Sequence, residues 1–243
     1  MSYPGAEQES DAESQWLLGW WYYVGKIVGR LNYPQDYSEA LKWFRKAAEQ
    51  NHAKSQNYIG DIYAMGKGVA QDYVEAVKWY RKAAEQGHWD AQNNLAVMYS
   101  RGTGVAKNYV EALKYLHKAA EHGYAHAQMN LGVTYRNGEG VAKDYAEALK
   151  WFRKAAEQDY PHAQNYLGDM YAMGQGVAED YTKAYMWYNL AAREFVDVAM
   201  ENKDSISEKM TREQITEAQK LSNEWLKRRG DLMHSLGLLF PKE

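Results

Sequence analysis

Four histidines and a set of glycine-rich loops are the residues whose types and spacing first suggest chemistry. His52 and His88 share one position of a 36-residue period, and His126 and His162 share another. Equivalent residues of stacked helix pairs lie about 8–10 Å apart, which is too far for two imidazoles to bind one metal ion unaided. We therefore interpret these histidines as surface side chains and expect no metal site.

The patterns of known catalytic loops are also missing. Loops such as Gly66-Lys67-Gly68 recur in every regular unit, but none ends in the lysine–serine pair of a phosphate-binding loop. Neither a G-x-S-x-G nor an H-E-x-x-H sequence is present. Carboxylates near the expected helix ends stand beside Lys or Arg and indicate solvated charge: Glu49, Glu85, Glu121 and Glu157. We expect no catalytic residue and no cofactor.

Asparagine recurs at one position of three units, as Asn57, Asn93 and Asn165. Asparagine is a poor helix former, so helix propensity does not explain this recurrence. Each amide offers donors and an acceptor that can bind an extended peptide backbone whatever its side chains are. Two other interpretations are that these amides form a hydrated surface or that they hydrogen-bond neighbouring repeats.

The composition sets further limits. The chain has 243 residues, 46% of them apolar, a formal net charge of −3 and no cysteine. It therefore has no disulfide and no cysteine-bound metal, and its charge argues against nucleic acid as a partner. No apolar stretch approaches the ~18 residues of a membrane span. Residues 1–10 do not resemble a signal peptide, which favours the cytoplasm, or the periplasm or exterior if a signal peptide has been removed.

The chain repeats itself with a period of 36 residues. Glutamine marks one position of the repeat at Gln56, Gln92, Gln128 and Gln164. Tyrosine marks another, and each unit closes with an alanine pair: Tyr63, Tyr99, Tyr135 and Tyr171; Ala47-Ala48, Ala83-Ala84, Ala119-Ala120, Ala155-Ala156 and Ala191-Ala192. A fixed period of this length predicts an α-solenoid, in which each unit buries its apolar face against its neighbours.

Each unit is predicted to contain two antiparallel helices. In the unit at 55–90, the first helix covers about 55–65 and is ended by Gly66. Asp72 is a suitable N-cap for the second helix, with Glu75 placed as in a capping box. Glycine within a helix costs about 1 kcal/mol, so Gly60 indicates a close approach of the partner helix. The fold is predicted to be all-α, with at least twelve helices.

The predicted organisation follows the period. The segments are a flexible N-terminus at 1–12, an irregular first repeat at 13–54, repeats at 55–90, 91–126, 127–162 and 163–198, capping helices at 199–230 and an apolar tail at 231–243. Residues 36–73 and 144–181 match at 28 of 38 positions, three repeats apart. We infer that a block of three repeats was duplicated and that the two copies present similar surfaces.

The repeated pattern A-Q-x-x-L-G-x-x-Y-x-x-G-x-G-V-x-x-D-Y-x-x-A-x-x-W-[FY]-x-x-A-A resembles the Sel-one-like repeat, the 36-residue relative of the tetratricopeptide repeat. The sequence departs from the pattern at Ser55 and at Ala96, which stands where other units have glycine. The resemblance implies a right-handed superhelix of helix pairs that serves as an adaptor or scaffold. Some bacterial members have one disulfide per repeat and bind β-lactam compounds, and this chain, without cysteine, differs from that branch.

The two ends of the chain are irregular. The first repeat carries five extra residues between Gly25 and Asp36, and its first helix is apolar on most faces. This unit is either a cap with a wide buried face or a surface for a partner or for self-association. At the other end, Thr211 and Gln214 form a predicted capping box and Gly230 is predicted to end the last helix. The tail either docks on the last repeat or enters a neighbouring molecule.

In tetratricopeptide-like solenoids the first helix of each unit lines the concave side. The resemblance therefore also indicates which residues of the first helices face the groove. From the recurring asparagines we predict that a partner segment lies extended along these helices, and that each Asn→Ala change weakens its binding but leaves the melting temperature nearly unchanged. The predicted groove residues are Trp16, Trp20, Tyr23, Asn57, Tyr58, Asp61, Asn93, Asn94, Arg101, Asn130, Arg136, Asn137, Asn165, Tyr166 and Asp169.

The predicted function is that of a non-enzymatic scaffold whose groove binds a protein or peptide. The alternative is a glycan-binding protein or a cell-wall-associated hydrolase that uses exposed aromatic rings. Against it, the tryptophans at the repeated position fall in the predicted packing stripe: Trp43, Trp79, Trp151 and Trp187. Trp89 is the exception, at a loop position held elsewhere by small residues. A designed consensus repeat is a third interpretation, and the irregular ends argue against it.

Overall fold

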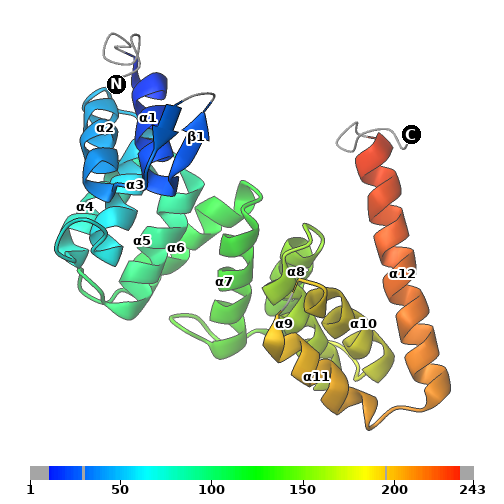
Figure 1. Ribbon diagram of the computed structural model, residues 1–243. Helices are drawn as coiled ribbons and strands as arrows, with labels where there is room; N and C mark the ends of the chain where they lie inside the picture. Colours follow the sequence, from blue (N-terminus) through cyan, green and yellow to red (C-terminus); the bar gives the residue numbers. More distant parts are fainter. Residues whose placement is uncertain (1–10, 29–30, 195, 236–243) are drawn as a thin grey trace. The chain divides into compact units, whose positions relative to one another are not determined.

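The computed structural model describes residues 11–28, 31–194 and 196–235, which form twelve helices and one short hairpin. The prediction of an all-α helical repeat fold is confirmed (Figure 1). Of the expected flexible N-terminus, residues 1–10 lie outside the described residues, as do residues 236–243 of the tail. The elements are α1 (Ala12–Val24), β1 (Lys26–Val28), β2 (Leu31–Tyr33), α2 (Tyr37–Glu49), α3 (Ala53–Met65), α4 (Tyr73–Glu85), α5 (Trp89–Arg101), α6 (Tyr109–Glu121), α7 (Ala125–Asn137), α8 (Tyr145–Ala156), α9 (Pro161–Ala172), α10 (Tyr181–Ala192), α11 (Asp197–Ser207) and α12 (Arg212–Ser235).

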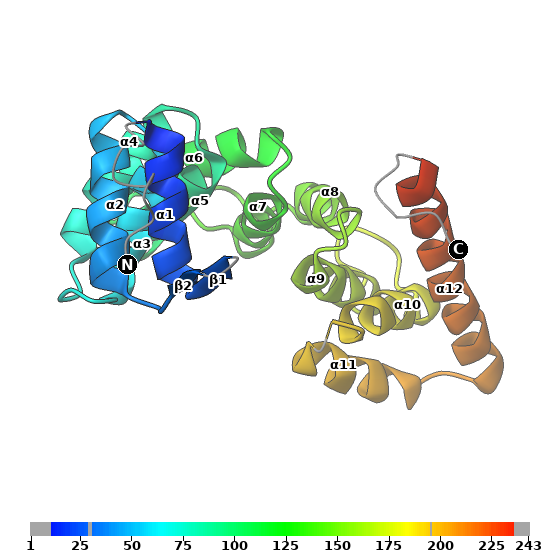
Figure 2. The same cartoon turned by 45° about the horizontal axis from the view of Figure 1, so that its top comes forward.

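The chain divides within α7 into two compact units, Met1–Ala127 and Gln128–Glu243. In the first unit, α1 packs on α2, α3 on α4 and α5 on α6, and α2 meets α3 and α4 meets α5 between the pairs. In the second unit, α8 packs on α9, α9 on α10, and both α11 and α12 on α10. Figure 2 shows α9, α10 and α11 side by side. Because short loops join successive helices, the members of each pair run in opposite directions.

The second helix of each unit begins at the predicted cap. Oδ1 of Asp72 accepts the backbone N–H of Glu75 at 2.9 Å, and Asp180 caps Lys183 in the same way. The Glu75 carboxylate does not complete the predicted capping box. It pairs instead with Lys78 at 2.8 Å and accepts the Trp79 indole N–H at 2.9 Å.

Two of the histidines interpreted as surface side chains cap first helices. Nδ1 of His52 accepts the N–H of Ser55 at 3.3 Å, and Nδ1 of His88 accepts the N–H of Ala91 at 3.4 Å. The caps satisfy backbone donors that a helix start leaves without an intrahelical partner. The sequence interpretation missed this role because histidine is an uncommon N-cap.

The two helices of a unit approach each other where a glycine faces an aromatic ring. A Cβ added at Gly60 would lie 2.5 Å from the Tyr80 ring, and one at Gly132 would lie 2.6 Å from the Phe152 ring. The same contact joins Gly19 to Phe44 and Gly168 to Tyr188. The predicted close approach at these glycines is confirmed. The third repeat has Ala96 in place of the smaller glycine, and the facing residue there is Leu116 instead of an aromatic ring.

The repeated glutamine is buried and accepts a hydrogen bond from within its unit. Gln86 donates to Gln56 at 2.7 Å and Gln158 donates to Gln128 at 2.8 Å, each from the end of a second helix to the preceding first helix. In the third repeat His122 takes the position of the donor. In this repeat, Oε1 of Gln92 is buried without a hydrogen-bond partner. A buried acceptor left unpaired lowers the stability of the fold.

The segment between Gly25 and Asp36, which is five residues longer than in the other repeats, contains the paired strands β1 and β2, which the sequence did not predict. The strands pair antiparallel, with Lys26 opposite Tyr33. Tyr33 is buried and its ring centroid lies 5.1 Å from those of Trp21 and Tyr22. The hairpin therefore covers one side of the aromatic helix α1.

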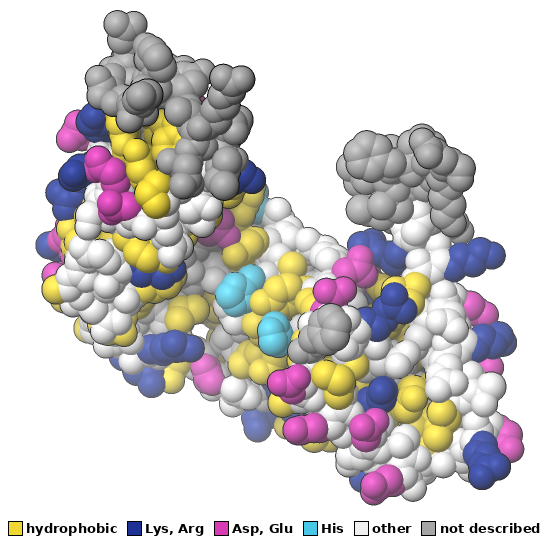
Figure 3. All heavy atoms as spheres, in the orientation of Figure 1, with side chains coloured by type: hydrophobic (Ala, Val, Ile, Leu, Met, Phe, Trp, Pro, Cys, Tyr) yellow, Lys and Arg dark blue, Asp and Glu magenta, His cyan; other side chains and the backbone are white. Residues whose placement is uncertain are grey.

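The C-terminal capping helix differs from the prediction in its length. The predicted capping box is confirmed, since Thr211 and Gln214 exchange hydrogen bonds of 2.8 and 3.3 Å. The prediction that Gly230 ends the helix is wrong, because α12 continues to Ser235. Figure 3 shows acidic and basic side chains interspersed along α12, as expected of a helix that covers the end of a solenoid.

The unpaired Gln92 acceptor gives a test of the glutamine pairs. His122→Gln restores the donor of the other units, so we expect the free energy of unfolding to rise by about 1 kcal/mol in urea melts. Gln86→His is the matched control and should lower it, because it removes the donor to Oε1 of the buried Gln56. Equal stability of both variants and the parent would contradict this account.

Candidate functional site

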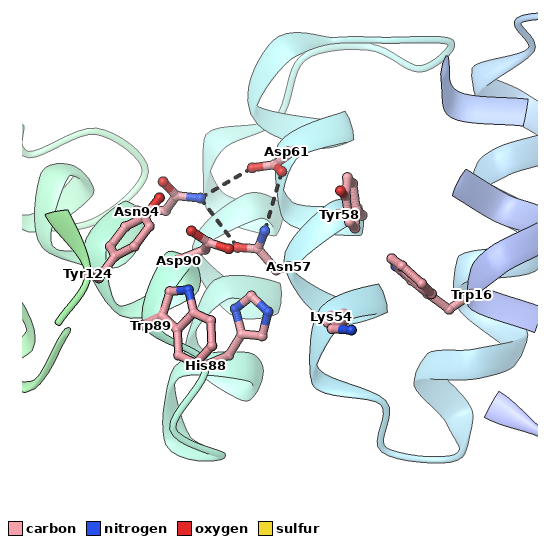
Figure 4. Close-up of a pocket in the computed structure, with 10 residues that line it drawn as sticks. All are labelled: Trp16, Lys54, Asn57, Tyr58, Asp61, His88, Trp89, Asp90, Asn94 and Tyr124. Atoms are coloured by element: carbon pink, nitrogen blue, oxygen red, sulfur yellow. Dashed lines mark hydrogen bonds between the residues drawn. The ribbon is translucent and has the colours of Figure 1, made fainter. Parts of the chain in front are cut away.

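A pocket of about 490 Å³ opens in the first unit between the first helices of adjacent repeats. Figure 4 shows α3 contributing Asn57, Tyr58 and Asp61, and α5 contributing Trp89, Asp90 and Asn94. The remaining lining residues are Trp16, Lys54, His88 and Tyr124. The pocket thus combines four aromatic rings with two carboxylates and two amides.

The polar floor of this pocket is a hydrogen-bonded cluster. The side-chain amide of Asn94 donates to Oδ1 of Asn57 and to Oδ1 of Asp61, both at 3.3 Å. The Asn57 amide donates to Oδ2 of Asp61 at 3.4 Å (Figure 4). The cluster therefore joins α3 to α5 and fixes the orientation of the Asp61 carboxylate.

The hydroxyl of Tyr80 completes the cluster from the second helix. It donates to Oδ1 of Asp61 at 2.8 Å. The ring of Tyr80 is the one that packs on Gly60, so the helix contact itself aims the hydroxyl at the next residue of α3. Tyrosine stands at this ring position in the second and fifth repeats, where aspartate follows the glycine. In the other three repeats the facing residue is phenylalanine or leucine, neither of which has a hydroxyl. The residue after the glycine position is apolar there: Trp20, Val97 and Val133.

Burial changes the acidity of the groups in the pocket. Burial is the main cause that raises the pKa of Asp61 from an ordinary value of 3.8 to about 6. The negative charge of Asp90 acts in the same direction, and the Tyr80 hydrogen bond and Lys67 oppose it. Burial likewise raises the pKa of Tyr80 and lowers that of His88. At neutral pH the pocket therefore contains a neutral imidazole beside a carboxylate whose charge is costly to bury.

The second unit repeats this arrangement three repeats further along the chain. Tyr188 donates to Asp169 at 2.9 Å, and Asn202 donates to Asn165 at 3.1 Å. A pocket of about 620 Å³ adjoins these groups, lined by His162, Asn165, Tyr166, Asp169, Glu194, Val196, Asp197, Val198 and Asn202. This agrees with the inferred duplication of a three-repeat block.

One difference between the two pockets concerns charge. In the second unit a guanidinium nitrogen of Arg136 lies 3.5 Å from the Asp169 carboxylate, and its central carbon lies 5.5 Å from the centroid of the Tyr166 ring. Nε of Arg136 donates to Gln175 at 3.2 Å. Asp169 therefore has a cation supplied by its own chain.

The structure divides the fifteen predicted groove residues. The first pocket includes Trp16, Asn57, Tyr58, Asp61 and Asn94, and the second includes Asn165, Tyr166 and Asp169. The others line neither pocket: Trp20, Tyr23, Asn93, Arg101, Asn130, Arg136 and Asn137.

The placement of Asn93 on a groove surface is wrong, since its side chain is 1% exposed. Trp20 and Tyr23 pack against the buried cluster around Phe44 and Ile59, so these rings serve the core of the first unit. Arg101 and Asn137 are exposed outside the pockets. Asn57 and Asn165 are buried as well, at 6% and 9% exposure, although they adjoin the pockets. Their part in binding a partner stays a prediction.

The sequence interpretation missed five lining residues of the first pocket: Lys54, His88, Trp89, Asp90 and Tyr124. They lie on the first turn of a first helix or just before it, outside the predicted groove phase. Trp89 gave the one available signal, because it departs from the small residues of the other repeats and is 50% exposed.

The described residues contain neither a cluster of metal ligands nor a membrane-spanning helix. No three His, Asp or Glu side chains in the described ranges cluster closely enough to hold a metal ion. Within the same part of the chain, no helix has both the length and the apolar character that crossing a membrane requires.

The fold and the pattern of contacts define a helical repeat protein, and the chain belongs to the Sel1 repeat family. The Sel1 repeat profile matches five successive segments, residues 12–52, 53–88, 89–124, 125–160 and 161–194. Proteins built from Sel1 repeats generally mediate protein–protein interactions and are generally non-catalytic.

Solved structures support the assignment. A Sel1 repeat protein from Oxalobacter formigenes is 34% identical, with a TM-score of 0.77 over 93% of this chain and 86% of that one. A protective antigen of uropathogenic Escherichia coli, c5321, is 30% identical with a TM-score of 0.56, and the match covers 98% of this chain and 58% of that one. A curated plant relative, the ERAD-associated E3 ubiquitin-protein ligase component HRD3A of Arabidopsis thaliana, is 35% identical over 61 residues, 25% of this chain and 8% of its own length.

The burial of Asn57 reverses one expectation from the sequence. Asn57 is 6% exposed and bonded to both Asp61 and Asn94. Asn57→Ala should therefore lower the free energy of unfolding by about 1–3 kcal/mol in urea melts, since it leaves buried partners unpaired. Arg101→Ala, at an exposed site, is the control and should leave it unchanged. An unaltered melt for Asn57→Ala would restore the original expectation.

The raised pKa of Asp61 predicts a pH-dependent stability. Because the folded state binds this proton more tightly than the unfolded chain does, the stability associated with Asp61 is greatest below pH 3.8 and falls as the pH rises through about 6. Asp61→Asn removes this fall. Relative to the parent, the variant should therefore gain about 1–3 kcal/mol between pH 4.5 and 7.5 in urea unfolding. A difference between variant and parent that is constant with pH would disprove the assignment.

Proposed function

We propose that the chain is a non-catalytic scaffold that binds a segment of a partner protein on the first-helix side of its repeats. The observation that carries this proposal is the pocket between α3 and α5, where an exposed Trp89 stands beside oriented amide and carboxylate groups. Tryptophan, tyrosine and charged groups around a partly buried pocket are typical of the anchoring sites of protein interfaces.

The glycan-binding alternative has weaker support. A sugar ring stacks on a flat aromatic face that is open to solvent. Trp151 and Trp187 are buried, and lysine ammonium groups lie 4.0 and 4.2 Å from the ring centroids of Trp43 and Trp79. Trp89 is the exposed tryptophan of the described residues, and its ring stacks on His88 with centroids 6.1 Å apart.

Site-specific photocrosslinking tests the proposal. A benzophenone amino acid placed at position 89 should crosslink a protein from the source cell, and excess unlabelled parent protein should compete. The same group at Val110, which is 71% exposed on the second helix α6, is the matched control and should not form this adduct. Equal adducts at both positions, or none at 89, would contradict binding at the pocket. Quenching of tryptophan fluorescence by soluble glycans, but not by the captured partner, would favour the alternative.

A further inference from the structure

The two duplicated pockets differ in how the buried aspartate is compensated. Asp169 of the second unit has the guanidinium of Arg136 at 3.5 Å. The position equivalent to Arg136 in the first unit is Tyr23, since Tyr23 follows Tyr22 as Arg136 follows Tyr135. Tyr23 has no charge to offer, and its ring meets the Tyr58 ring at 5.3 Å. The aromatic contact of the second unit is thus kept, but the cation is not.

Two lysines of the first unit could supply the missing positive charge, but both interact with other groups. Lys67 occupies the position of Gln175, and its ammonium donates to the Tyr23 hydroxyl at 3.1 Å. Lys54 lies over the Trp16 ring at 4.7 Å and 3.9 Å from the Glu13 carboxylate. In the described ranges, no Lys, Arg or His nitrogen comes within 4.0 Å of the Asp61 carboxylate.

The first pocket is also better built for an external cation than the second. It adds Trp89 and Asp90 where the second unit has Asp197 and Val198. Aromatic faces attract cations, and they do so most strongly in partly desolvated sites. The second pocket has further carboxylates of its own in Glu194 and Asp197, so the aromatic rings are what distinguishes the first pocket. The first pocket therefore has an aromatic wall, an oriented acceptor in Asp61 and a cavity of about 490 Å³ beside them.

Resting on the proposed function, we propose that this pocket binds an arginine side chain of the partner protein, which approaches Asp61 from the pocket and supplies the positive charge that Arg136 supplies to Asp169 in the second unit. The internal example shows the mode of binding: a guanidinium near the aspartate, facing a tyrosine ring and donating to an amide oxygen. Arginine suits this mode because its planar group donates in several directions and stacks on aromatic faces. Lysine offers a point charge without that plane.

The test uses small probes, so that it does not depend on a captured partner. N-acetyl-arginine amide is titrated into the full-length protein while the indole signals of Trp16 and Trp89 are followed by NMR. N-acetyl-citrulline amide has nearly the same shape without the charge. We expect the arginine probe to shift both signals in the millimolar range and the citrulline and lysine analogues to bind at least fivefold more weakly. Equal binding of either analogue, or no shift with arginine, would overturn the proposal.

Two reciprocal exchanges sharpen the test. Tyr23→Arg with Lys67→Gln introduces the cation of the second unit into the first and should abolish probe binding there. Arg136→Tyr with Gln175→Lys should open the second pocket, seen as new shifts of the Val198 methyl signals. Asp61→Asn should weaken binding at least fivefold, whereas Asp204→Asn, an exposed carboxylate on α11, should not. Melting curves verify that each variant is folded.

The results separate the two proposals. Parent-like affinity in folded Asp61→Asn protein would disprove the arginine assignment. If the first-unit exchange does not fold, unchanged affinity in Asp61→Asn or no opening of the second pocket overturns the proposal by itself. Crosslinking at position 89 without binding of the arginine probe would leave the scaffold function intact and remove only the inference about arginine.

Discussion

The contact between a glycine of the first helix and a ring of the second is the constraint on which the structure depends. At Gly60 and Gly132 the facing ring occupies the space that a side chain would fill. Such a contact lets two helix backbones approach closely, and it fixes their relative position more tightly than flexible side chains could. The third repeat keeps the fit by exchanging both sides at once, with Ala96 and Leu116. Size complementarity, rather than glycine itself, is what each repeat preserves.

The same contact places the polar chemistry of the two units. Where the ring is tyrosine, its hydroxyl extends beyond the glycine and meets the next residue of the first helix, as Tyr80 meets Asp61 and Tyr188 meets Asp169. A carboxylate can remain on the half-buried side of these helices because a donor is already aimed at it. Phe152 offers no such donor, and the matching position there is the apolar Val133. Packing and polarity are therefore set by one pair of positions.

The sequence predicted most of the fold and only part of the site. The repeat period, the helix caps and the glycines are visible in the local sequence. The helices and the close approach at Gly60 and Gly132 could therefore be predicted from them. The burial of Asn93 could not, because it depends on how deeply the neighbouring repeat covers that position. The hairpin around β1 and β2 lies in an insertion without a repeated counterpart. Trp89, Asp90 and Tyr124 line the pocket from the starts of helices. The spacing of residues along a helix face does not predict which way side chains at or before the first turn are directed.

The comparison of the two aspartates separates a structural from a functional role. A buried carboxylate with its own cation, such as Asp169 with Arg136, is partly compensated within the fold, although burial still raises its pKa. Asp61 accepts hydrogen bonds from Tyr80, Asn57 and Asn94 but has no ion pair among the described residues, and burial raises its pKa to about 6. Asparagine could accept the Tyr80 hydrogen bond at that position without the cost of a buried charge. Proteins depart from such local optima mainly at functional sites. Both oxygens of Asp61 accept hydrogen bonds, which an asparagine amide could not match, and a cation from outside the chain, as proposed above, would add compensation for its charge.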